Sequence, residues 1–424
     1  MTSRKIITLL SLLIIIGAIL IPQPIFAEEL VGSTFVIAND NLQEVKPSIA
    51  YNSQRNHYLV VWHNDRPGND DIRAQKVASD GSMIGGPFYI SAGPGHDRRK
   101  PDVAYNSAHD QYLVVWEDQN NADPIQGYSI CAKRVSGTGM VLDTNDIIIA
   151  GPGSIGFLPS NPAVAYASVS DRYLVVWQRE DAFIPMIKSI KSQVVTHQGH
   201  LEGTAKVISS SLQKRFAPDL AYNPRENRYM VAWQQYDNST SSYDVMGRQV
   251  AGNGSLWGSI VNYGNSGVAH EGPAVAALPN DKSDKTYLIV WIDDLGPAGF
   301  GCTQAYINQA GILRGGWGYV LPTDIIAHIT VAANKKNNTY LIGLQFDQGT
   351  KDKSISLSLE DCEGIHLDNF VIPGPAYDFP AIAAGPSGSY LTAWQGQPLS
   401  ITHTNIYGRI IQSQSLSYLP LIKR

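Results

Sequence analysis

The amino-acid sequence predicts an all-β fold in which seven four-stranded antiparallel sheets close into a ring. The chain of 424 residues repeats one pattern seven times, at intervals of 51 to 61 residues. Each copy holds the pieces of four short strands, and the strand that the last copy lacks is present near the N-terminus. Periods near this length are typical of ring-forming β-sheet repeats and not of helical solenoids.

The first strand of each sheet follows an anchor, which in the first copy reads KPSIAY from Lys46. Its proline can open a strand, because no hydrogen-bond donor is needed at that place. The anchors are marked by Pro47, Pro101, Pro162, Pro218, Pro273, Ile329 (in place of a proline) and Pro380.

The second strand carries the most regular part of the repeat, first seen as YLVVW at Tyr58 to Trp62. β-branched and aromatic residues of this kind favour strands. The same aromatic pair returns as Tyr112 and Trp116, Tyr173 and Trp177, Tyr229 and Trp233, Tyr287 and Trp291, Tyr340 and Leu344, and Tyr390 and Trp394. Because every copy keeps the pair, we interpret it as core between neighbouring sheets and not as a ligand contact.

The third and fourth strands appear in the first copy as DIRAQKV from Asp71 and FYISAG from Phe88, separated by the turn signal Asp80-Gly81. The seventh copy ends after its third strand, at Ile411. Its fourth strand is present at the other end of the chain, where STFVIAND from Ser33 matches the first copy's GPFYISAG. An N-terminal strand that completes the last sheet would close the ring and remove an exposed edge.

These residues resemble the seven-bladed β-propellers, and more narrowly a type of secreted bacterial propeller with repeats of the form P-x-x-A-Y, Y-L-V-V-W, D-I-x-x-x-x-V and D-G. The resemblance covers roughly Ser33 to Gln412. The motifs that mark Trp-Asp, kelch, sialidase and integrin-type blades are absent from the sequence. The resemblance therefore implies a fold and no particular activity, because propellers host many unrelated functions.

The N-terminus has the features of an export signal. Arg4 and Lys5 precede an apolar run over 6–21, and Ala27 ends a small-residue cleavage pattern. We expect a signal peptide at 1–27, a single propeller domain at 28–413 and a C-terminal tail at 414–424. An uncleaved membrane anchor is the alternative for the first segment. The last part of the tail, SYLPLIKR from Ser417, could be a surface-retention signal, a capping strand or a frayed end.

Composition limits the classes of partner. The charged fraction is 16% and the net charge is -5, without a block of like charge, so we expect no nucleic-acid partner and no membrane span after signal cleavage. The three cysteines, Cys131, Cys302 and Cys362, have no metal-ligand spacing. Two of them should lie at opposite ends of equivalent strands, and we expect all three to be unpaired.

Seven copies allow an internal comparison. Positions that recur in every copy should serve the architecture, whereas a binding site should use positions that differ. Propeller ligands usually meet the face formed by the loops between strands two and three and between successive blades. We therefore expect a site at the channel mouth, just after each Trp and just before each Pro. The candidate ligand-binding residues are His96, Asp97, Arg98, Arg99, Arg215, His270, Glu271, His328, Tyr377 and Asp378.

Each group of candidates has its own chemistry. The loop at 96–99 is the most polar, and with Arg215 across the mouth it could bind a carboxylate or an acidic sugar; a solvated loop is the alternative. His270, Glu271 and His328 could converge as a metal site or an acid-base pair, although no spacing rule supports this. Tyr377 and Asp378, with Tyr236 and Phe183, could form an aromatic rim for sugar stacking.

Acidic residues at strand ends could supply a glycosidase pair or hold calcium, although acidic turns are ordinary there. They are Asp65, Asp70, Asp71, Glu117, Asp118, Asp293 and Asp294. Apart from calcium, we expect no cofactor.

The sequence contains no nucleophile elbow, HExxH, P-loop or dinucleotide fingerprint in a suitable context. We therefore expect a secreted or cell-surface binding protein, a monomer, that recognises an extracellular glycan, peptide or protein through one propeller face. The alternative is a polysaccharide-acting glycoside hydrolase or lyase that uses carboxylates at the channel mouth and His270.

Overall fold

The computed structural model describes residues 32–40, 42–66, 68–121, 127–151, 157–181, 188–210, 213–264, 269–278, 284–321, 325–347, 353–361, 364–372, 377–397 and 403–412. The expected signal peptide, Phe183, Cys362 and the C-terminal tail lie outside these ranges, as do the side chains of Glu271 and Tyr377. Within the described ranges, no helix has the length and apolar character needed to cross a membrane.

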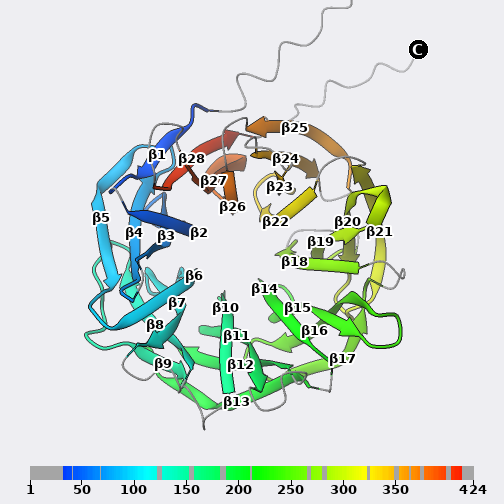
Figure 1. Ribbon diagram of the computed structural model, residues 1–424, viewed down its shortest axis with the longest axis horizontal. Coiled ribbons are helices and arrows are strands. Elements are labelled where there is room, and N and C mark those ends of the chain that lie inside the picture. The colour runs from blue at the N-terminus through cyan, green and yellow to red at the C-terminus, as the bar shows by residue number, and fades with distance from the viewer. Residues whose placement is uncertain are drawn as a thin grey trace, which may run out of the picture.

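Seven four-stranded antiparallel sheets are arranged in a ring (Figure 1). Their inner strands line two cavities at its centre, which together we call the central channel. From the inner to the outer strand, blade 1 holds β2 (Gln43–Asn52), β3 (His57–Asp65), β4 (Asp71–Ala78) and β5 (Met83–Ser91). Blade 2 holds β6 (His96–Asn106), β7 (Gln111–Asn120), β8 (Tyr128–Ser136) and β9 (Ile147–Ala150). Blade 3 holds β10 (Phe157–Ala167), β11 (Arg172–Asp181), β12 (Lys188–Thr196) and β13 (Leu201–Ser210).

Blade 4 holds β14 (Arg215–Asn223), β15 (Arg228–Asp237), β16 (Ser242–Ala251) and β17 (Leu256–Asn262). Blade 5 holds β18 (Ala269–Ala277), β19 (Tyr287–Asp294), β20 (Phe300–Ile307) and β21 (Leu313–Leu321). Blade 6 holds β22 (Ile325–Asn334), β23 (Thr339–Asp347), β24 (Lys353–Asp361) and β25 (His366–Ile372). Blade 7 holds β26 (Tyr377–Ala384), β27 (Ser389–Gly396), β28 (Asn405–Gln412) and β1 (Phe35–Ala38). Within the described ranges, short 3-10 helices cover Gly296–Ala298 and Pro386–Gly388.

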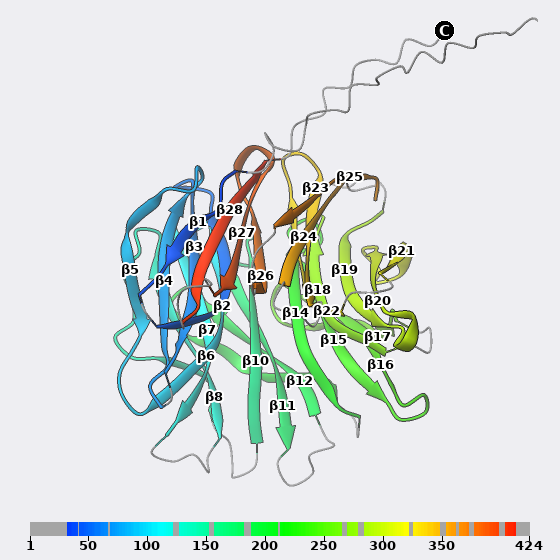
Figure 2. The same cartoon turned by 45° about the horizontal axis from the view of Figure 1, so that its top comes forward.

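The N-terminal strand closes the ring, as the sequence predicts. In β1, Phe35 pairs with Gly408 and Val36 pairs with Tyr407 of β28. Glycine is required at position 408, because a Cβ there would lie 2.7 Å from the ring of Phe35. The first and last described strands, β1 and β28, therefore share one sheet, which leaves no open array of blades (Figure 2).

The core lies between neighbouring blades, and the YLVVW strands build it. All seven repeat tyrosines and five of the repeat tryptophans have less than 2% of their surface exposed. Each core cluster joins two adjacent blades; one, for example, contains Leu59 and Ile72 of blade 1 with Tyr112 and Trp116 of blade 2. The interpretation of the aromatic pair as core is confirmed. Leu344, which replaces the Trp in blade 6, is also buried, at 3% exposure.

Each inner strand carries a β-bulge at its anchor. In blade 1 the register shifts between Val45 and Ser48, so Lys46 and Pro47 lie opposite one residue of β3. A proline cannot donate a hydrogen bond to the ladder, which explains why the pairing breaks there. Blade 6 has Ile329 in place of the proline, so its ladder pairs Ile329 with Leu344 and the bulge moves one position earlier, between Ile326 and His328.

The bulge gives the residue before the proline a left-handed backbone. These residues and their φ angles are Lys46 at 52°, Lys100 at 50°, Asn161 at 50°, Ala217 at 45°, Gly272 at 57° and Phe379 at 52°. Only glycine adopts this conformation without cost, and other L-residues lose about 1 to 2 kcal/mol there. In most blades, the residue before the proline is therefore in a strained backbone conformation.

Candidate ligand-binding site in the central channel

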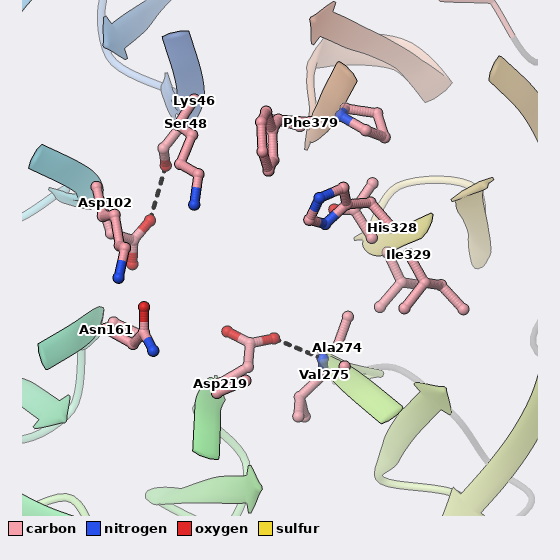
Figure 3. Close-up of a pocket in the computed structure, with 18 of the residues that line it drawn as sticks. Lys46, Ser48, Asp102, Asn161, Asp219, Ala274, Val275, His328, Ile329 and Phe379 are labelled. Carbon is pink, nitrogen blue, oxygen red and sulfur yellow. Dashed lines mark hydrogen bonds between the residues drawn. The ribbon is translucent and has the colours of Figure 1, made fainter. Parts of the chain in front are cut away.

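The bulges bring one residue from each blade to the end of the channel where the inner strands begin. We call this end the upper end and the seven residues the upper ring. The upper ring consists of Lys46, Lys100, Asn161, Ala217, Gly272, His328 and Phe379. With the residues that follow them in the inner strands, they line a cavity of about 490 Å³, shown in Figure 3.

One side of the upper ring combines a cation with two rings. The ammonium of Lys46 lies 4.6 Å from the ring centroid of Phe379, and the imidazole of His328 lies 4.3 Å from the same centroid. Burial, together with the positive charge of Lys46, lowers the pKa of His328 to about 4. Burial and repulsion from Lys100 also lower the pKa of Lys46. At neutral pH this side therefore offers a positive charge beside an aromatic ring and a neutral imidazole.

Side chains from the preceding blade hold the amides of the upper ring. Gln178 Oε1 accepts the backbone N–H of Ala217 at 3.0 Å, and Gln345 Oε1 accepts that of Phe379 at 3.0 Å. Glu117 Oε1 accepts the N–H of Asn161 at 2.5 Å and pairs with Lys100 Nζ at 2.9 Å. Each of these polar residues follows the repeat Trp, or Leu344 in blade 6. This position therefore ties one blade to the next through the backbone of the strained residue.

Two carboxylates lie one step deeper, two residues after the upper ring. Asp102 accepts a hydrogen bond from Ser48 Oγ at 2.7 Å and one from the N–H of Val164 at 2.8 Å. Asp219 accepts one from the N–H of Val275 at 2.7 Å through Oδ2 (Figure 3). Both side chains are half-buried. Burial raises the pKa of both, that of Asp219 to about 7, so this carboxyl can be protonated near neutral pH.

The structure places Arg98 and Arg215 at equivalent positions, three residues before the repeat proline. Both are buried, at 5% and 3% exposure. Arg98 Nη1 donates to the carbonyl oxygen of Gly93 at 3.1 Å, and Arg215 donates to Ser209 Oγ at 2.8 Å and to the carbonyl of Lys188 at 3.2 Å. Burial lowers the pKa of Arg215 to about 10. The two guanidinium groups thus tie successive blades together, and carboxylate binding by this pair stays a prediction.

The segment 96–99, expected as a loop, is the first part of strand β6. His96 pairs with Asn120 and Arg99 pairs with Glu117, because β7 continues beyond Trp116 and offers a partner on the far side of the bulge. The polar side chains contact one another locally. His96 Nδ1 lies 2.9 Å from Asp118 Oδ1, and Arg99 lies 2.5 Å from Asp70 and 3.5 Å from Asp97. The expectation of a loop was therefore wrong.

His270 and His328 have different surroundings. His270, 2% exposed, places Nδ1 2.5 Å from Asp293 Oδ1, and the indole Nε1 of Trp291 donates to the same carboxylate oxygen at 2.8 Å. His328 instead lines the channel cavity. The side chain of Glu271 lies outside the described part of the chain, so convergence of the three residues stays a prediction.

The remaining candidates belong to the start of β26. Asp378 accepts hydrogen bonds from Gln345 Nε2 at 2.7 Å and from Lys353 Nζ at 2.8 Å. The backbone of Tyr377 pairs with Gly396. Tyr236 packs edge-on against Tyr243, with the ring centroids 5.1 Å apart. The aromatic rim likewise stays a prediction.

Most of the acidic residues expected to serve a glycosidase or a calcium ion have local basic partners. Asp70 pairs with Arg99, Asp71 with Arg66, Glu117 with Lys100, Asp118 with His96 and Asp293 with His270. The carboxylates that line the channel cavity, Asp102 and Asp219, were not among the candidates. Lys46, Lys100, Asn161 and Phe379 were also not among the candidates. The sequence did contain a signal for them, because the residue type before the repeat proline differs between the aligned copies.

Comparison with known proteins gives a fold and no family. No family model matches the chain, and no curated protein matches it. A protein of unknown function from Dyadobacter fermentans is 12% identical, with 89% of this chain and 97% of that chain covered and a TM-score of 0.53. The Hadza microbial sialidase Hz136 is 10% identical, with 74% and 66% covered and a TM-score of 0.50.

A mutant α-L-arabinofuranosidase of Fusarium graminearum, in complex with an iminosugar inhibitor, is 14% identical. The match covers 90% of this chain and 98% of that chain, with a TM-score of 0.50. Likeness at such low identity concerns the fold alone. The chain is thus a seven-bladed β-propeller of four-stranded antiparallel blades, closed by its N-terminal strand.

Proposed function

We propose that this chain is an extracellular binding protein that recognises an acidic glycan at the upper end of its channel. The proposal rests on the residues of the upper ring. At one place in the repeat, seven blades present six residue types: lysine twice, then asparagine, alanine, glycine, histidine and phenylalanine. The extracellular location rests on the N-terminal signal pattern.

The chemistry of the upper ring suits an acidic sugar. Lys46 and Lys100 come from adjacent blades and can bind a carboxylate as two point charges. The ring of Phe379 can pack against the apolar face of a pyranose. Asn161 and Asp219 offer a donor and acceptors for hydroxyl groups. The cavity of about 490 Å³ lies within the usual range for small-ligand sites.

Binding is favoured over hydrolysis by what the two channel carboxylates already do. Both oxygens of Asp102 accept hydrogen bonds from neighbouring blades, and so does Oδ2 of Asp219. A carboxylate whose oxygens already accept structural hydrogen bonds is poorly placed to act as a nucleophile or a base.

One observation keeps a hydrolase as the second candidate. Burial raises the pKa of Asp219 to about 7, and a carboxylic acid that is protonated near neutral pH suits a general acid in glycoside hydrolysis. In that role Asp219 would protonate the leaving oxygen, and Asp102 would be the second carboxyl group.

The deciding experiment is a glycan array with the mature chain, followed by calorimetric titration of the best ligand. We expect sialylated or uronic-acid glycans to bind and their neutral counterparts to bind much more weakly. Lys46→Ala and Phe379→Ala should each weaken binding about tenfold or more, as expected when a charged contact or a stacked ring is lost. Both variants should keep the wild-type unfolding midpoint.

The matched control is Lys336→Ala, which removes an exposed lysine at the opposite end of the same channel. Its affinity should equal that of the wild type. Equal binding of neutral glycans, or unchanged affinity of Lys46→Ala, would exclude the proposed site. Glycan cleavage that Asp219→Asn abolishes while binding persists would favour the hydrolase.

A further inference from the structure

The junction between blades 2 and 3 carries two histidines and an aspartate in contact, on the face opposite the upper ring. His109 follows β6, Asp171 follows β10 and His197 follows β12. His109 Nε2 and His197 Nδ1 each lie 2.9 Å from Asp171 Oδ2. The two imidazoles stack with their centroids 3.8 Å apart and their planes 16° apart.

The neighbouring junction shows what this position does in the absence of the histidines. Between blades 1 and 2, Arg55 Nε lies 2.5 Å from Asp110 Oδ2, in the places that His109 and Asp171 take one blade later. The place of His197 is taken by Gly137, where a Cβ would lie 2.0 Å from Asp110 Oδ1. One junction therefore has a simple ion pair, whereas the next has two imidazoles on one carboxylate oxygen.

The carboxylate of Asp171 is oriented by neutral groups. Tyr166 Oη donates to Oδ1 at 2.9 Å and Asn106 Nδ2 donates to the same oxygen at 3.4 Å, which leaves Oδ2 facing the histidines. The carboxylate is thus held by an outer shell of hydrogen bonds, as metal-binding carboxylates are.

The second histidine is fixed through its backbone. The carbonyl oxygen of His197 accepts hydrogen bonds from Gln111 Nε2 at 2.6 Å and from Arg134 Nη1 at 3.1 Å, both in blade 2. The turn that carries His197 is therefore held against the blade that carries His109. The side chains of His109, Asp171 and His197 are 37%, 31% and 27% exposed, and the Nδ1 atom of His197 itself is buried.

We propose that His109, Asp171 and His197 bind a divalent transition-metal ion, for which zinc is the best match. Two imidazole nitrogens and one carboxylate oxygen are the donors that zinc takes at about 2.0 to 2.2 Å. Ligands of a tetrahedral zinc ion lie about 3.3 Å apart at such bond lengths, close to the 2.9 Å observed from each nitrogen to Oδ2. Three protein ligands leave the fourth position for water or an external ligand.

The proposed metal site lies next to the cavity at the lower end of the channel. Tyr166, which orients Asp171, also lines a cavity of about 650 Å³ at the lower end of the channel. A zinc ion held by Asp171 would stand behind the wall of that cavity. This proposal is independent of glycan binding at the upper end, because it uses none of the upper-ring residues.

The test is calorimetric titration of Zn²⁺ into the mature chain, purified without a histidine tag. One high-affinity site is expected. His109→Ala and His197→Ala should each weaken it by about 100-fold or more, and Tyr166→Phe, which removes an outer-shell hydrogen bond, by about tenfold. The control is His200→Ala, since His200 is exposed in the same turn as His197 and its loss should change nothing.

A second variant separates metal binding from a purely structural ion pair. His109→Arg restores the residue found at the preceding junction, so its unfolding midpoint without metal should match the wild type. Its zinc affinity should nevertheless fall as far as that of His109→Ala. Zinc binding that survives both substitutions at position 109, or a wild-type chain that binds no zinc, would overturn the proposal.

Discussion

The two ends of the channel are built from the same seven inner strands, yet they use them differently. At the upper end, the upper-ring position holds six different residue types in the seven blades. At the lower end, blades 1 to 4 present the same residue to the cavity and blades 5 to 7 have alanine in its place. The tyrosines are Tyr51, Tyr105, Tyr166 and Tyr222, and the alanines are Ala277, Ala333 and Ala384.

The difference follows from which part of the residue makes the structural contact. Each lower tyrosine donates its own O–H to an Asx side chain five residues later, as Tyr166 does to Asp171 at 2.9 Å and Tyr222 to Asn227 at 2.9 Å. At the upper end, Gln178 and Gln345 bind the backbone N–H instead. A backbone contact leaves the side chain free to vary, so recognition can evolve at the upper ring without loss of the fold.

The largest expected effect comes from removing a lower tyrosine. Tyr105→Ala loses the packing of its ring on Tyr112, at a centroid distance of 5.1 Å, and its hydrogen bond to Asp110 at 3.2 Å. The free energy of unfolding should fall by about 3 kcal/mol, measured by urea denaturation. Lys46→Ala in the upper ring should change it by less than about 0.5 kcal/mol. Similar losses in both variants would remove the distinction between the two ends.

A smaller effect is expected from the carboxyl group of Asp219. Its folded-state pKa of about 7 lies above the value of about 3.9 in an unfolded chain. The folded state therefore holds the proton more tightly, and this group lowers stability as the pH rises from about 4 to about 7.

Asp219→Asn stays neutral and should remove that part of the pH dependence. The difference in the free energy of unfolding between Asp219→Asn and the wild type should be about 1 to 2 kcal/mol larger at about pH 7.5 than at about pH 4.5. Solvent screening of this half-buried group makes the difference smaller than the pKa shift alone would give. Urea denaturation at both pH values checks it. The control is Asp80→Asn, in an exposed turn, which should show the same decrease in the free energy of unfolding with pH as the wild type. If Asp219→Asn also showed that decrease, Asp219 would not be its cause.

The smallest effect concerns backbone strain in the upper ring. Ala217 has a φ of 45°, so Ala217→Gly should raise the free energy of unfolding by about 0.5 to 1 kcal/mol. Ala165→Gly, in the extended part of the inner strand of blade 3, should lower it by a similar amount. Thermal unfolding of the two variants compares them directly, and equal signs would mean that the bulge stores no strain.

Much of the architecture could be predicted because it repeats. The strand that carries Tyr58 and Trp62, its copies and the closure by the segment around Phe35 all follow from aligned patterns. The segment 96–99 was predicted less well, since turn-like residues hid the continuation of β6 past the bulge. Polarity alone could not separate Arg98, buried at a blade junction, from Lys46, which faces the channel.

The sequence by itself determined the seven blades, their strands and the closing strand, because hydrophobic periodicity and turn residues are local and recur along the chain. Only the tertiary structure decided which residues meet. Lys46, Asp102, Asp219, His328 and Phe379 converge on one cavity, and His109, Asp171 and His197 converge at one junction. The first convergence depends on ring closure and on the bulge at each anchor, and the second depends on the packing of blade 2 against blade 3. Both bring together residues that lie far apart in the chain.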